Sequence, residues 1–183
     1  MRHVICALSL LFCLVPPIQA GPNLTVLFQF ENKHSSESLE VMKKELQSLM
    51  TGIEVDWRLI EDLRAGESFP DLVVVKFRGS CQMEAIPPYL IDERGPAALA
   101  FTHTSDGTVL PFSEVACDKV RLTIQSAMHG DDFRHADALL GRALGRVLAH
   151  ELYHVIENTK HHQKEGVNRS ALTGAQLIAD RQP

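Results

Sequence analysis

This sequence lacks an excess of basic residues and a long apolar run after residue 20, and each absence excludes a class of partner or protein. Aromatic residues make up only 6% of the 183 positions, while 45% are hydrophobic and no segment is of low complexity. Basic residues are not in excess, since 18 Lys and Arg face 23 Asp and Glu, so nucleic acids and anionic membranes are not expected partners. No apolar run after residue 20 approaches membrane-spanning length. The composition is that of a globular protein with one core.

Residues 1–20 are predicted to be an export signal rather than part of the fold. A short basic start, MRH, precedes the apolar run VICALSLLFCLV, and PPIQA ends in a small residue before Gly21. A membrane anchor is the alternative, but the run is short for a spanning helix. We therefore expect a secreted or periplasmic protein with one domain, 21–183, and no membrane span once the signal is removed.

Cysteine is also rare, and its placement predicts one disulfide. Two of the four cysteines lie within residues 1–20, which leaves Cys81 and Cys117. Two cysteines in an exported chain most simply pair with each other. A thiolate metal site is the alternative, but these cysteines lack the close Cys-x-x-Cys spacing of a zinc knuckle.

The first half of the chain has the pattern of alternating strands and a helix. Strands are expected at 24–30, 53–60 and 71–77, where β-branched and apolar residues are concentrated. Apolar residues at helical spacing predict a helix at about 35–50, capped by Ser35 or Ser36. A strand, a helix and a strand at this spacing predict a crossover between parallel strands.

The second half predicts an edge hairpin followed by a long helix. Strands at about 97–104 and 107–124 flank the turn at Asp106-Gly107, and Pro111 is expected to keep the second strand from a central position. Residues 129–158 predict the longest helix, capped by Asp131 or Asp132. Gly141 and Gly145 within it are expected to permit a close approach to the sheet, and 174–180 to form a short last helix.

These elements predict an α/β (α+β) fold. A mixed twisted sheet would carry a backing helix and an edge hairpin, followed by the long helix and a short C-terminal segment.

The end of the long helix contains the segment HELYH, which predicts a zinc site. His150 and His154 are four residues apart, so a helix places both on one face. Two imidazoles at this spacing bind zinc, and Glu151 is placed to take a proton from a zinc-activated water. Two ordinary surface histidines on a helix are the alternative.

A catalytic zinc requires a third protein ligand, and the sequence offers several candidates. Asn158 can adopt the left-handed conformation that ends helices, so the chain is expected to reverse and bring TKHH towards the metal. This reversal makes His161 or His162 the best third ligand. The other candidates are Glu157, Glu165 and Asp180, of which Asp180 is a weaker option.

The segment HELYH with a histidine soon after it resembles the metzincin zinc metallopeptidases, whose motif is H-E-x-x-H-x-x-G-x-x-H. It is still more similar to a group of exported bacterial proteins of uncharacterised function, in which H-E-L-Y-H precedes a histidine eight residues after the second one and then Gly-Val. The resemblance covers residues 99–172, most specifically 149–167. It implies a zincin fold, one Zn²⁺ per chain, His162 as the third ligand before Gly166-Val167, and Glu151 as the catalytic base.

The chain departs from the strict metzincin pattern at several positions. Lys160 stands where the third ligand would fall, Glu157 stands at the glycine position, and no methionine follows Met128 to form a methionine turn. We expect Leu172 to supply the apolar floor in place of that methionine. If His161 is not a ligand, it is a candidate donor to the developing oxyanion.

The leading hypothesis is a secreted zinc-dependent metallopeptidase acting on a peptide or protein substrate. The edge strand at about 97–104 would pair with an extended peptide. The alternatives are an exported zinc-binding protein without peptidase activity and a zinc-dependent amide or ester hydrolase.

Overall fold

The computed structural model describes residues 23–83 and 98–182, so the predicted export signal lies outside the described residues. The strands are β1 (Asn23–Phe30), β2 (Glu54–Leu59), β3 (Leu72–Arg78), β4 (Ala100–Ser105) and β5 (Thr108–Ala116). The α-helices are α1 (Ser36–Leu49), α2 (Cys117–Gln125), α3 (Ala136–Ile156) and α4 (Gly174–Ile178), and short 3₁₀ turns lie at Ile60–Asp62 and Gly130–His135. Within these ranges, no helix is both long and apolar enough to cross a membrane.

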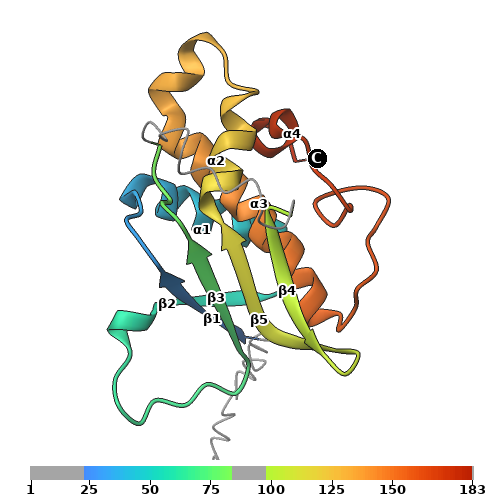
Figure 1. Ribbon diagram of the computed structural model, residues 1–183. Helices are drawn as coiled ribbons and strands as arrows, with labels where there is room; N and C mark the ends of the chain where they lie inside the picture. Colours follow the sequence, from blue (N-terminus) through green and yellow to red (C-terminus); the bar gives the residue numbers. More distant parts are fainter. Residues whose placement is uncertain (1–22, 84–97, 183) are drawn as a thin grey trace, which may run out of the picture.

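The five strands form one mixed sheet in the order β2-β1-β3-β5-β4. Strands β2, β1, β3 and β5 are parallel, whereas β4 pairs antiparallel with β5 at the edge. Helices α1 and α3 lie on the same side of this sheet (Figure 1). The predicted mixed sheet, the parallel pairing of β1 with β2 and the edge hairpin are therefore confirmed.

The position predicted for the second strand of the hairpin is wrong. Strand β5 has a neighbour on each side, and β4 is the edge strand. Pairing of β5 with β3 begins at Phe112, opposite Val74, so Pro111 precedes the first residue that this ladder contains. Pro111 has no backbone N–H, but because it lies before the paired residues, the missing N–H costs no hydrogen bond to β3.

Two boundaries also differ from the prediction. The segment expected to continue β5 as far as residue 124 is helix α2, in which Cys117, Val120 and Ile124 are buried at helical spacing. The long helix begins at Ala136, and Asp132 caps the preceding 3₁₀ turn by accepting a hydrogen bond from the His129 backbone N–H at 2.8 Å.

The prediction that the glycines of α3 approach the sheet is wrong, because they approach helix α1. A Cβ atom added at Gly145 would lie 2.9 Å from the Met42 carbonyl oxygen, and one added at Gly141 would lie 2.8 Å from the Val41 Cβ. Glycine therefore lets α1 pack closely along α3. This packing fixes the helix that carries His150, Glu151 and His154.

Cys81 and Cys117 form the predicted disulfide. Both cysteines are buried, and the bond joins the segment after β3 to the first residue of α2. The core also contains Phe28 and Phe77 from the sheet and Leu144 and Leu148 from α3.

Candidate metal centre

The last two turns of α3 present His150, Glu151 and His154 towards one side. Glu151 is 5% exposed and His154 is 8% exposed. The helix ends as the sequence predicted, because Asn158 has a φ of 44°, in the left-handed region. The Asn158 side-chain oxygen also accepts a hydrogen bond from the Val109 N–H at 3.3 Å, which ties the β4–β5 hairpin to the end of α3.

The chain that follows Asn158 returns along the helix and brings His162 to the two helix histidines. The His162 ring centroid lies 5.1 Å from that of His150 and 4.9 Å from that of His154. One nitrogen from each of the three rings lies within 4.8 Å of the other two, so these histidines could hold a metal ion.

The other ligand candidates are placed differently. The backbone N–H of His161 donates to the Thr159 hydroxyl at 3.1 Å, and its side chain is outside the cluster. Asp180 forms an ion pair with Arg142 at 2.9 Å. Neither Glu157 nor Glu165 belongs to the cluster.

Backbone carbonyls fix the tautomer of both helix histidines. The Nδ1 atom of His150 lies 2.9 Å from the Val167 carbonyl oxygen, and that of His154 lies 2.8 Å from the Thr159 carbonyl oxygen. A carbonyl oxygen can only accept, so each Nδ1 must carry the proton and donate it. Each Nε2 is therefore left with a lone pair, as in histidines that bind metals.

The two Nε2 atoms lie only 3.0 Å apart. Burial lowers the pKa of His150 and of His154, so both rings are neutral at pH 7. Two lone pairs this close repel each other unless a cation lies between them. Two nitrogens bound to one tetrahedral zinc at 2.0–2.1 Å are separated by about 3.3 Å, so the donor set fits zinc.

Glu151 is a buried acid with one side-chain hydrogen bond among the described residues. Burial raises its pKa to about 7, and a hydrogen bond from Thr102 partly opposes this rise. The Thr102 hydroxyl on β4 donates to Glu151 Oε2 at 2.6 Å and lies 2.9 Å from the Ser113 hydroxyl on β5. A carboxyl group with a pKa near neutrality is suited to accept and release protons.

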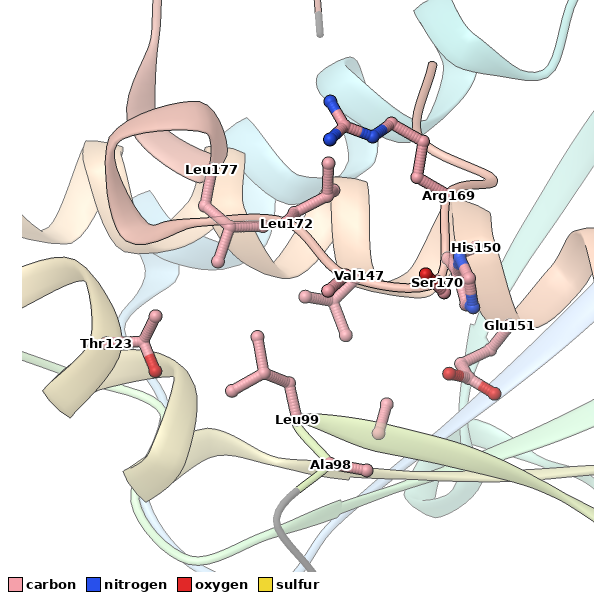
Figure 2. Close-up of a pocket in the computed structure, with 12 residues that line it drawn as sticks. Ala98, Leu99, Thr123, Val147, His150, Glu151, Arg169, Ser170, Leu172 and Leu177 are labelled. Carbon is pink, nitrogen blue, oxygen red and sulfur yellow. The ribbon is translucent and has the colours of Figure 1, made fainter. Parts of the chain in front are cut away.

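A cavity of about 480 Å³ opens beside Glu151 and His150. Figure 2 shows these two residues at one end of the cavity with Ser170 beside them, and Thr123 at the other end. The aliphatic wall includes Leu99, Val147, Leu172 and Leu177. Leu172, the residue expected to form an apolar floor, is therefore part of this wall.

Some residues of the site were not identified from the sequence. Thr102 had no motif to mark it, because its role depends on the edge strand lying beside α3. The contacts made by Thr159 and Val167 use backbone oxygens, which any residue provides. Gly166 precedes Val167 with a φ of 72°, a conformation that favours glycine, and this was the one available signal.

His103 and Tyr153 both lie outside the histidine cluster. The His103 ring lies 3.3 Å from the Glu114 carboxylate on the neighbouring strand. Tyr153 accepts a hydrogen bond at its hydroxyl from the Gln163 side-chain amide at 2.9 Å.

Comparison with known proteins finds no family model, no curated protein and no solved structure that matches the chain.

Proposed function

We propose that this protein is an exported zinc-dependent metallopeptidase with one Zn²⁺ per chain. The observation that supports this best is the convergence of His150, His154 and His162 beside the buried Glu151. Three protein ligands with a carboxylate next to them are the arrangement of catalytic zinc sites, which keep a coordination position open. The resemblance of HELYH to the metzincin motif and the predicted signal at 1–20 support the same assignment.

In this proposal, His150, His154 and His162 would hold the zinc ion, which would supply Lewis-acid activation of the substrate carbonyl and of a water molecule. Glu151 accepts a proton from the attacking water and then delivers it to the leaving amine nitrogen. Its Oε2 is held by Thr102, so Oε1 remains for proton transfer. Carbonyls of Thr159 and Val167 keep the helix histidines in the tautomer that can bind metal.

The substrate in this proposal is an extended peptide with an apolar side chain next to the bond that is cut. Strand β4 lies at the edge of the sheet and its hydroxyl residue Thr102 contacts Glu151, so a peptide paired with β4 would pass the site. The cavity next to Glu151 has a largely aliphatic wall, which favours an apolar side chain.

Zinc stoichiometry measured by elemental analysis tests the metal centre. We expect one zinc per chain in the wild-type protein and in His161→Ala, and a loss of zinc in His162→Ala. His161→Ala is the matched control, because it removes the neighbouring histidine of the same segment. A wild-type protein that binds no zinc, purified without chelator, would end the enzyme assignment.

Activity is tested with Glu151→Gln on a peptide library. This variant should keep its zinc and lose hydrolysis by at least about 10²-fold, the scale of general-base catalysis. If the zinc-loaded wild-type protein cuts esters or small amides but no peptide, the non-peptidase hydrolase is the better assignment. If it cuts neither, it is a zinc-binding protein without this activity.

A further inference from the structure

The segment 159–167 contains His162 and contacts the other two histidines of the candidate centre, His150 and His154. At its first residue, the Thr159 carbonyl accepts from His154, and at its last residue, the Val167 carbonyl accepts from His150. Between these two contacts the segment carries His162 itself. The arrangement of the complete ligand set therefore depends on the course of one segment.

His162 differs from the two helix histidines in how it is held. His150 and His154 stand on a buried helix and donate to carbonyls, whereas His162 is exposed. Across residues 23–83 and 98–182, no hydrogen bond to the His162 ring is found. Apart from its ring contacts with His150 and His154, its position therefore depends on the backbone on either side of it.

The residue after His162 makes two contacts that hold this part of the segment. The Gln163 N–H donates to the Asn168 carbonyl at 2.8 Å, as part of an isolated bridge to Arg169. Its side-chain amide donates to the Tyr153 hydroxyl at 2.9 Å. Of these two contacts, only the second connects the middle of the segment to helix α3.

We propose that Tyr153 is a positioning residue for the metal centre, an inference that rests on the proposed zinc site. Its hydroxyl holds the Gln163 side chain and thereby keeps the adjacent His162 ring beside His150 and His154. Tyr153 immediately precedes His154 on α3. This contact therefore links the third ligand to the same helix that carries the first two. Residues outside the first coordination sphere that orient ligands typically change metal affinity by 10–100-fold when they are substituted.

A purely structural role for Tyr153 makes a different prediction. Its side chain also lines a small cavity with Leu49 and Met50 at the end of α1, so the ring contributes to packing. Phenylalanine keeps the ring and removes only the hydroxyl. A role in packing therefore predicts unchanged metal affinity in Tyr153→Phe, whereas positioning predicts weaker binding.

The test measures zinc affinity by competition with a chromophoric chelator in Tyr153→Phe, Gln163→Ala and the double variant. We expect each single variant to bind zinc at least about 10-fold more weakly, and the double variant to be no weaker than the weaker single. Gln182→Ala is the matched control, because its side-chain amide makes an exposed hydrogen bond to the Ser48 hydroxyl, and neither residue lines the small cavity beside Tyr153. The metal-free stability of Tyr153→Phe is measured alongside, and the absorption spectrum of the cobalt-substituted protein reports the ligand geometry.

The outcomes separate this inference from the proposed function. Weaker zinc binding with an altered cobalt spectrum and unchanged metal-free stability supports positioning by Tyr153. Zinc affinity equal to that of the wild type in Tyr153→Phe overturns the inference and leaves the zinc site intact. If the wild-type protein binds no zinc, the metal centre is refuted and the inference is refuted with it.

Discussion

The Thr102 hydroxyl donates a hydrogen bond to the Glu151 carboxylate at 2.6 Å, and valine has nearly the same shape as threonine without the donor. Thr102→Val should lower the free energy of unfolding by about 1–3 kcal/mol, because it removes the partner of a buried carboxyl group and of the buried Ser113 hydroxyl. Thr102→Ser keeps the hydroxyl and should retain most of the stability. Urea denaturation at pH 8 measures both. Equal losses in the two variants would show that the hydroxyl is unimportant.

Glu151 should also make the stability of the metal-free protein depend on pH. Burial raises its pKa from 4.5 to about 7 in the folded protein. The folded state then holds a proton that the unfolded chain releases, so stability contributed below pH 4.5 is lost as pH rises to about 7. A shift of this size corresponds to about 3 kcal/mol.

The substitution Glu151→Gln removes this titration, and the glutamine side-chain oxygen can still accept the hydrogen bond from Thr102. In chelator-treated protein, we expect the stability of Glu151→Gln relative to the wild type to increase between pH 5 and pH 8. His150 and His154 titrate in both proteins, so their contribution largely cancels in the difference. Parallel stability curves over this range would contradict a buried Glu151 with a raised pKa.

At the scale of elements, the contact of α1 with α3 depends on glycine. Alanine in place of glycine usually stabilises a helix by about 0.5–1 kcal/mol. Gly141→Ala should instead destabilise the protein by about 1–3 kcal/mol, because the new Cβ would meet the Ser38 carbonyl oxygen and the Val41 side chain. Thermal unfolding measures the change, and Ala138→Gly reports the intrinsic cost of glycine in the same helix. A gain in stability for Gly141→Ala would mean that α1 moves away easily.

The elements themselves were predictable where one periodicity dominated. Strands β1 and β3 and helix α1 follow clear patterns, and the Asp106-Gly107 turn marks the hairpin. Helix α2 was missed because it follows β5 without a turn signal, and its apolar residues are too few to distinguish a helix from a continued strand. Packing against the core decides this case, since Cys117, Val120 and Ile124 are all buried.

At the scale of the whole molecule, the disulfide joins two parts of the chain that are separated by 36 positions. Replacing both Cys81 and Cys117 by alanine should lower the free energy of unfolding by roughly 3–4 kcal/mol in the chain-entropy model. Urea denaturation of this variant, and of the wild type with and without reductant, measures the loss. Zinc binding should persist wherever the variant stays folded, because the proposed ligands all lie on α3 and the segment after it. Loss of zinc by a folded variant would contradict this independence.

The sequence by itself determined the local features of this protein. The spacing in HELYH placed two imidazoles and a carboxyl group on one helix face, and the conformational freedom of Asn158 predicted the reversal after it. These are properties of neighbouring residues, so periodicity and backbone preference are sufficient to derive them.

The choice of His162 over His161 came from resemblance, and the fold brings His162 into the cluster. Only the tertiary structure decided that Thr102 meets Glu151, that carbonyls of Thr159 and Val167 hold the helix histidines, and that α1 rather than the sheet fills the space beside Gly141 and Gly145. Such contacts join residues distant in sequence, often through backbone atoms common to every residue, so no local pattern encodes them.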